Sequence, residues 1–257
     1  CWCRSCVRLL GVLGGGHELA LDQLAPQQLA HRGARQLPDE HDAARALELV
    51  RLGGAFLLNR GRIREKFAWA HKAALLTEPT LNAPLWAKAQ HYIGFAYRNL
   101  SDLEERTQNL RFAIEAYERA LIYRTSQNAP LEYAMTQNNL GFIYWELASF
   151  ENPIDNLRYA ITAYRHALEY RTPQRDPRGY AMTQNNLGLA YWRLANEEDR
   201  IENLRRAIAA YKCALEYRTP EIAHLDYATT QNNLGIVYAE LAGDEDAPLS
   251  LSHAIKD

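Results

Sequence analysis

Long apolar runs are missing from this sequence, and so is any excess of charge of one sign. No stretch approaches the roughly 18–20 apolar residues that a membrane-spanning helix needs. The chain has 29 lysines and arginines and 31 aspartates and glutamates, which leaves a formal net charge of −2 at pH 7. Such a balance gives no general attraction to nucleic acid or to anionic lipid. We therefore expect a chain that binds neither nucleic acid nor membranes.

Cysteine is scarce: the chain has four, and Cys1, Cys3 and Cys6 stand together at its start. Thiolates at such short spacing can share a metal ion, but no fourth ligand follows at an expected spacing. We predict no metal site and interpret residues 1–40 as an irregular or disordered leader. Without a framework of paired cysteines, a reducing cytoplasm is the simplest compartment.

Motifs of known catalytic chemistry are also missing. The sequence has no Gly-rich phosphate loop, no HExxH, no nucleophile elbow and no Cys/His pair at a meaningful spacing. We therefore predict that the chain is not an enzyme and has neither catalytic residues nor a cofactor.

A repeat dominates what the sequence does contain. The hexapeptide Thr-Gln-Asn-Asn-Leu-Gly occurs at 136–141, 183–188 and 230–235, so that consecutive copies start 47 positions apart. Further residues recur at this spacing: Gly94, Gly141, Gly188 and Gly235; Tyr97, Tyr144, Tyr191 and Tyr238; Leu110, Leu157, Leu204 and Leu251. A period between about 20 and 50 residues is typical of solenoids and propellers, whose units bury their apolar faces by stacking on one another.

Each period is predicted to form two helices, helix A at 133–148 and helix B at 154–170 in one unit. Helix B has the three- and four-residue apolar spacing of an amphipathic helix. Pro173 and Pro220 follow helices B and cannot continue them. Arg171 and Arg218 stand at the same helix ends, where we expect them to complement the helix dipole as caps. The sequence therefore predicts an all-α chain.

The turns between helices A and B are predicted to carry acidic side chains, which solvated turn chemistry explains. These residues are Glu151, Asp155, Glu197, Glu198, Asp199, Asp244, Glu245 and Asp246.

Helix A has two different faces. One face is expected to pack on helix B and on the neighbouring unit, and it contains Tyr133, Leu140, Tyr144 and Leu147. Gly141 lies beside this face, where a missing side chain lets two helices approach closely. The opposite stripe is the candidate binding surface, and it contains Asn138, Phe142 and Trp145 with Met135, Asn139 and Glu146 at its flanks.

At these positions the sequence resembles the tetratricopeptide repeat. The family pattern is Trp-x2-Leu-Gly-x2-Tyr, then Ala-x3-Phe, Ala and Pro. Its counterparts here are Gln137, Leu140, Gly141, Tyr144, Ala160, Tyr164, Ala167 and, one place late, Pro173. The family period is about 34 residues, so the 47-residue period is more similar to the long repeats of kinesin light chain and of bacterial signalling proteins rich in Asn-Asn-Leu-Gly. The resemblance implies an α-α superhelix, or solenoid, of helix-turn-helix units.

The resembling array covers residues 41–257. Its units are predicted at about 42–80, 84–130, 131–177, 178–224 and 225–257, the last one truncated. The sequence begins without Met, and its last residues, 251–257, match only the start of a helix B. We therefore expect a fragment. A truncated unit would expose apolar surface and permit self-association.

Asparagine pairs are the leading candidates for ligand contact. One carboxamide offers two donors and an acceptor, so it can hold a peptide N–H and C=O without reading the side chains. By resemblance, Asn139, Asn186 and Asn233 match the asparagine ladder of the repeat domain in O-GlcNAc transferase. Their neighbours, expected nearer the centre of the groove, are Asn138, Asn185 and Asn232. The alternative is that one asparagine of each pair bonds a neighbouring helix or loop and stabilises the stack.

Aromatic and charged residues complete the predicted peptide-binding set. Phe142 and Trp145, and likewise Leu189 and Trp192, are candidate anchors of the kind that dominate binding hot spots; packing between successive helices A is the alternative. At the next position Glu146, Arg193 and Glu240 alternate in charge. This mixture argues against a C-terminal carboxylate as the principal ligand.

The resemblance implies a cytoplasmic protein-interaction scaffold that binds an extended peptide or a partner helix in its concave groove. The alternative is the sensor or regulatory arm of a larger bacterial signalling protein, whose caspase-like peptidase, kinase or NTPase domain lies outside this sequence. A repeat protein that reads RNA would need a basic groove and specificity residues that vary between units. The near-neutral charge and the repeated asparagine pairs argue against that class.

Overall fold

A computed structural model describes residues 79–254 of the chain, and side chains within residues 82–244. This part contains helices and no strands, which confirms the predicted all-α class. The helices are α4 (Pro79–Ser101), α5 (Arg106–Tyr123), α6 (Pro130–Leu147), α7 (Pro153–Leu168), α8 (Pro177–Leu194), α9 (Arg200–Leu215) and α10 (Pro220–Ala254). The predicted leader and almost all of the first predicted unit, 42–80, lie outside the described residues.

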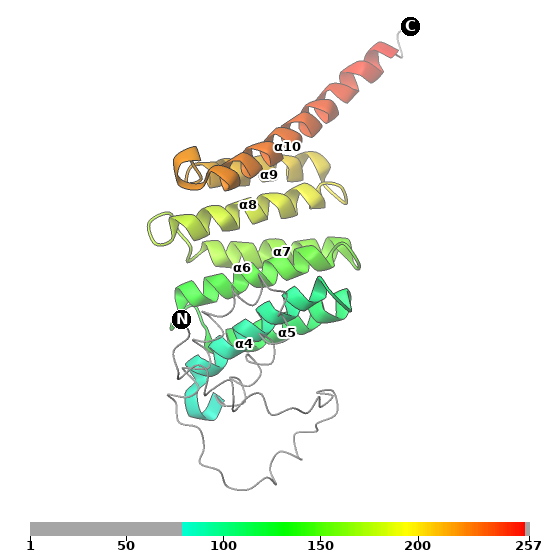
Figure 1. Cartoon of the computed structure of the whole chain (residues 1–257). Helices are drawn as coiled ribbons and strands as arrows, with labels where there is room; N and C mark the ends of the chain where they lie inside the picture. The colour runs from blue at the N-terminus through cyan, green and yellow to red at the C-terminus, as the bar shows by residue number, and fades with distance from the viewer. Residues whose placement is uncertain (1–78, 255–257) are drawn as a thin grey trace. The chain divides into compact units, whose positions relative to one another are not determined.

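Helices A and B of each unit pack in pairs, and the pairs are layered on one another. The helices A are α4, α6, α8 and the first part of α10; the helices B are α5, α7 and α9. Each helix contacts the next along the chain, and each helix A also contacts the helix A of the following unit. Figure 1 shows the resulting stack, with successive pairs one above another. Side chains on successive helices A are therefore close enough to interact.

Helix boundaries follow the 47-residue spacing. The predicted helices at 133–148 and 154–170 are observed as α6 and α7. Each helix B begins directly after one residue in the left-handed region. These residues are Glu105, Asn152 and Asp199, with φ of 40°, 43° and 44°. A positive φ is uncommon for residues other than glycine, so its return every 47 positions shows that the backbone repeats even where the residue types differ.

Tyrosines of helices B explain the repeated glycines of helices A. Tyr117, Tyr164 and Tyr211 are almost completely buried. A Cβ atom added to Gly141 would stand 2.9 Å from Tyr164 Cδ1, and one added to Gly188 would stand 2.7 Å from Tyr211 Cε1. Real Cβ atoms essentially never come so close to another heavy atom. The predicted close approach of two helices at these glycines is thus confirmed, with a tyrosine ring filling the space.

The last unit differs from its prediction. A turn between helices A and B was expected near Asp244, Glu245 and Asp246, but these residues lie inside α10, which continues to Ala254. In the inner units such a turn brings a buried tyrosine of helix B against the glycine of helix A.

Candidate functional site

The structure separates the two asparagines of each predicted pair. Asn138 and Asn185 have only 4% and 7% of their surface exposed, because they lie between successive helices A rather than at the centre of a groove. Asn139, Asn186 and Asn233 are half-buried. Asn232, in the last unit, is exposed. Half-exposure leaves Asn139, Asn186 and Asn233 accessible to a partner.

Hydrogen bonds join the asparagines of one helix A to those of the next. Asn186 Nδ2 donates to Asn138 Oδ1 over 3.4 Å. One unit earlier, His91 occupies the position of Asn138, and its Nε2 lies 3.5 Å from Asn139 Nδ2. These contacts between units involve both members of a pair, Asn138 and Asn139, and also Asn186, so the expected alternative, in which an asparagine serves the stack, describes all three. Asn185 also serves it, since its Oδ1 accepts from Thr230.

Arginines at the ends of helices B connect each unit to the next, a role beyond the expected capping. Arg171 and Arg218 were expected to cap their helices, but they are buried. Their Nη1 atoms donate to hydroxyls of the next helix A, Thr183 at 3.1 Å and Thr230 at 2.8 Å. Arg124 donates to Thr136 in the same way, and burial lowers the pKa of all three guanidinium groups. The common spacing of these arginines and threonines was the available signal.

The predicted tryptophan and charged positions also join one unit to the next. Arg193 Nη1 donates to the Trp145 carbonyl over 2.7 Å, and its guanidinium lies 5.0 Å from the centre of the Trp145 ring. Glu146 is buried and pairs with Arg98 over 3.5 Å; burial raises its pKa, an effect that Arg98 opposes. Trp192 Nε1 donates to Glu240. Packing between helices A, the alternative to ligand contact, thus occupies much of this stripe.

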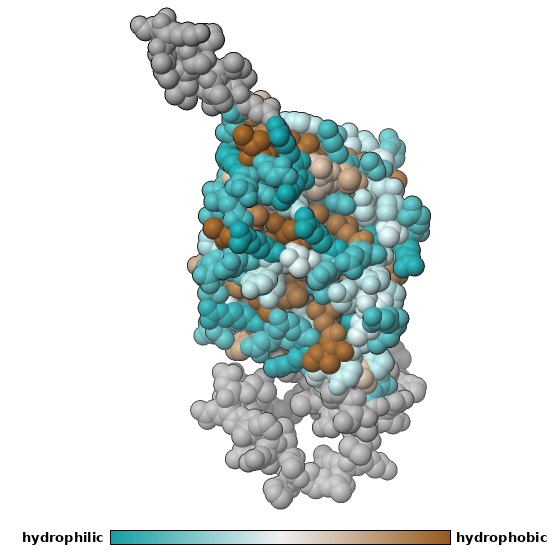
Figure 2. Space-filling model, turned by 180° about the vertical axis from the view of Figure 1, so that it is seen from behind, coloured by the Kyte–Doolittle hydropathy of each residue, from teal (hydrophilic) through white to brown (hydrophobic). Residues whose placement is uncertain are grey.

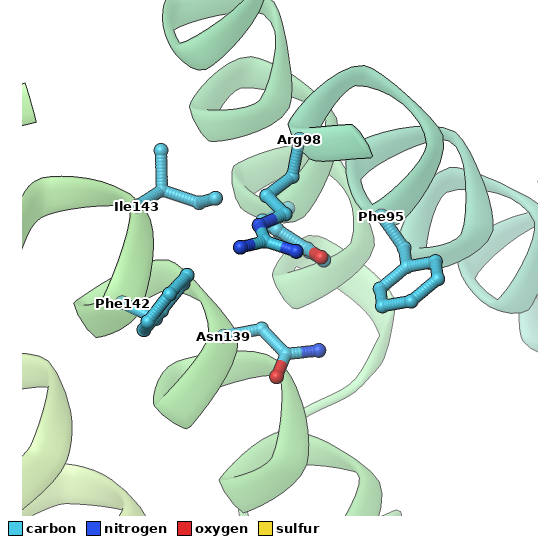
Figure 3. A pocket seen from close by; sticks show the side chains of 6 residues that line it. Phe95, Arg98, Asn139, Phe142 and Ile143 are labelled. Atoms are coloured by element: carbon cyan, nitrogen blue, oxygen red, sulfur yellow. The ribbon is translucent and has the colours of Figure 1, made fainter. Parts of the chain in front are cut away.

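A small hollow of about 170 Å³ remains open between α4 and α6. Its lining consists of Phe95, Arg98, Tyr117, Asn139, Phe142 and Ile143. Figure 3 shows the side chains of α4 on one side and those of α6 on the other. Burial raises the pKa of Tyr117, and the neighbouring Asn139 side chain opposes that rise. The hollow thus combines apolar walls with an amide, a phenol and the guanidinium group of Arg98.

The tyrosine and asparagine positions of this hollow recur in the later units. Tyr164 with Asn186, and Tyr211 with Asn233, stand where Tyr117 and Asn139 stand in the first described unit. The Tyr211 hydroxyl is buried without a hydrogen-bond partner. Buried polar groups are normally satisfied in folded proteins; within the described residues Gln90 Oε1, Trp145 Nε1 and Arg171 Nε also lack a hydrogen-bond partner.

A larger hollow, of about 760 Å³, lies where α8, α9 and α10 meet. Ile222 and Leu225 line it and are 76% and 72% exposed, with Arg178 and Asp226 nearby. The repeat pattern did not predict this hollow. The positions of Ile222 and Leu225 are occupied in the preceding unit by Arg175 and Arg178, so no apolar residue recurs there.

Two further expectations concern metals and membranes. Within residues 79–254 no group of three or more His, Cys, Asp or Glu side chains is placed to hold a metal ion. None of the helices described there is long and apolar enough to cross a membrane. The cysteines at positions 1, 3 and 6 lie outside the described residues.

Comparison with solved structures identifies the architecture. The crystal structure of BtubC (BKLC) from P. vanneervenii aligns with 84% of this chain and 88% of its own, at a TM-score of 0.56 and 23% sequence identity. The chain is an α-solenoid. The likeness supports a tetratricopeptide-type, kinesin-light-chain-like fold, while membership of the long-period subclass stays a prediction. No protein-family model matches the chain, and no curated protein does.

Proposed function

We propose that this chain is a protein-interaction scaffold that binds an extended peptide along its helices A. The supporting observation is the row of half-buried carboxamides at Asn139, Asn186 and Asn233, one in each of the last three helices A. Solenoids commonly use an extended concave surface in this way. The asparagines that lie deeper, Asn138 and Asn185, support the row from beneath rather than touching the ligand.

An extended peptide suits carboxamides better than a partner helix does. Backbone N–H and C=O groups inside a helix already bond one another, whereas those of an extended chain are free to pair with a carboxamide. The alternative is a sensor or regulatory arm of a larger signalling protein. That role, and a bacterial and cytoplasmic setting, stay predictions, and no contact among the described residues favours them.

The test is a peptide-display selection on the full chain, beside the triple variant Asn139→Ala, Asn186→Ala and Asn233→Ala. We expect enriched peptides with the unmodified chain and their loss with the triple variant. Each asparagine hydrogen bond contributes about 1 kcal/mol, so the triple variant should lose at most about 3 kcal/mol of stability, and circular dichroism should show that it remains folded.

Asn196→Ala serves as the control, since Asn196 is an exposed asparagine in the turn after α8, away from the asparagine row. It should keep the enriched peptides. The proposal is wrong if the triple variant, still folded, retains them, or if the folded chain enriches no peptide.

A further inference from the structure

The first part of α10 leaves open a surface that is buried at the end of α8. Three pairs of residues, each 47 positions apart, differ in this way. Tyr191, Leu194 and Ala195 are 5%, 5% and 2% exposed. At the same positions of α10, Tyr238 is 42% exposed, Leu241 is half-buried and Ala242 is exposed. We call Tyr238, Leu241 and Ala242 the open face of α10.

In each earlier unit the tyrosine at this position meets a side chain of the helix B that follows it. The pairs are Tyr97 with Phe112 at 5.1 Å and Tyr144 with Tyr159 at 5.2 Å between ring centres, and Arg206 Cζ with the Tyr191 ring centre at 5.9 Å. Tyr191 also meets Arg165 of the preceding helix B, and Tyr238 meets Lys212 in the same way. Among the described residues Tyr238 thus has the neighbour from the preceding helix B but none from a following one.

Residues 247–257 contain the apolar pattern of a helix B. Leu251, Ala254 and Ile255 stand at the positions of Leu204, Ala207 and Ile208, which are buried in α9. His253 follows Tyr238 by 15 positions, the separation at which Arg206 follows Tyr191. This segment therefore has the residues that would cover the open face of α10 in the register of the repeat.

The helix α10 holds this segment away from the open face of its own chain. After its kink at Ala223, α10 runs on as one helix to Ala254, whereas the earlier units turn back between helices A and B. Position 253 is therefore displaced from Tyr238 by about 22 Å along the helix axis, at 1.5 Å per residue. In this conformation the segment cannot cover its own Tyr238.

A second copy of the chain can supply the missing contact. Because a short turn joins helices A and B of one unit, they run antiparallel, with Tyr191 opposite Arg206. Two α10 helices laid antiparallel in this register place Tyr238 of each copy opposite position 253 of the other. Both contacts form at once, so the pair closes with two-fold symmetry.

We propose that the open face of α10 binds residues 247–257 of a second copy, and that two chains form a closed dimer by exchanging these segments. Each exchanged segment takes the place that helix B has in the earlier units. The dimer contact uses none of the asparagines of the row, so it is independent of the proposed peptide binding.

The first experiment measures the mass of the full chain by light scattering after size-exclusion chromatography, over a series of concentrations. We expect the mass of two chains, which falls to that of one chain on dilution. The mass of one chain at every concentration would overturn the inference, whether the segment then stays free or folds back on its own α10.

The double variant Leu251→Asp, Ile255→Asp removes the apolar side chains of the segment. We expect its dimer dissociation constant to rise at least about hundredfold, because two apolar side chains are no longer buried at each junction. Ser252→Asp is the matched control, since it adds the same charge at a position whose counterpart in α9, Arg205, is exposed, and it should remain a dimer. A dimer that survives in the double variant would show that the chains associate elsewhere.

A mixing experiment distinguishes exchange from a contact between two open faces. Tyr238→Asp damages the open face but keeps the segment intact, and alone it should have the mass of one chain. Mixed with the double variant, which keeps an intact open face, it should form a mixed dimer held by one junction, detected by native mass spectrometry. If both variants are folded by circular dichroism and no mixed dimer forms, the exchange is wrong.

Discussion

One hexapeptide occurs in two environments. In α8, within the inner part of the stack, Thr183, Asn185, Leu187 and Gly188 are all buried. In α10 the same six residue types leave Gly235 with nothing within 4 Å of an added Cβ. The difference arises because α9 packs its tyrosine against α8, whereas no helix B follows the first part of α10 in the described residues. Burial in this repeat protein therefore depends on the neighbouring unit as much as on the local sequence.

Apolar surface is accordingly distributed unevenly. Figure 2 shows one face of the stack, on which apolar patches are interrupted by polar residues. Around α10, by contrast, exposed apolar side chains gather: Ile222, Leu225, Ile236 and Tyr238. Four predictions would sharpen this comparison between the inner units and the last one.

The largest expected effect concerns acid pH at the first described junction. Burial, first, and then Arg124 and Arg171 lower the pKa of His91 from 6.5 to about 3. Between these two pH values the unfolded chain therefore binds a proton that the folded chain does not. The free energy of unfolding should be highest above pH 6.5 and should fall as the pH is lowered toward 3. At pH 4 the loss should be on the order of 3 kcal/mol.

His91→Asn places at this junction the residue that stands at positions 138 and 185. Thermal melts from pH 7 to pH 4 should show a smaller loss of stability in the variant than in the unmodified chain. Parallel curves for the two proteins would mean that His91 does not set the acid sensitivity.

The next effect is steric. Gly188→Val would place a branched side chain where even a Cβ lies 2.7 Å from the Tyr211 ring, and we expect a destabilisation of about 1–3 kcal/mol from overpacking. Gly235→Val should change the free energy of unfolding by less than about 0.5 kcal/mol, as at an ordinary surface site. Melting temperatures of the two variants, measured together, test the contrast, and equal losses would refute it.

A smaller effect is expected from the buried arginine bridge. Thr183→Val keeps the shape of the side chain but removes the oxygen that accepts from Arg171. The unpaired guanidinium hydrogen should cost about 1–2 kcal/mol. Thr229→Val, at an exposed position of α10, is the matched control with little expected change. Denaturation of both variants would reveal whether the bridge supports the stack.

The smallest effect has the opposite sign. Gly235→Ala should stabilise the chain by about 0.5–1 kcal/mol, because alanine favours a helix over glycine and nothing stands in its way. Gly188→Ala should instead destabilise, since the Tyr211 ring must move. A gain at both positions, measured by thermal melting, would show that the tyrosine packing is looser than these distances imply.

Particular residues show how far sequence reasoning reached. The need for glycine at 141 and 188 could be predicted, because a repeated glycine in an apolar helix face implies close contact. The roles of Asn138 and Asn139 could not be separated, since a carboxamide suits the stack and a ligand equally well. The bond from Arg171 to Thr183 was not predicted for a similar reason, because an arginine after helix B can cap that helix or reach the next one.

By itself the sequence determined the period, the all-α class and the order of the two helices in each unit. These follow from apolar spacing and from residues that end helices, which act over a few positions along one chain. Tertiary structure alone decided which asparagine is buried, that Trp145 meets Arg193, and that α10 runs on without a turn. Such outcomes depend on contacts between residues some 40 or more positions apart, or on a neighbouring helix being present to pack against.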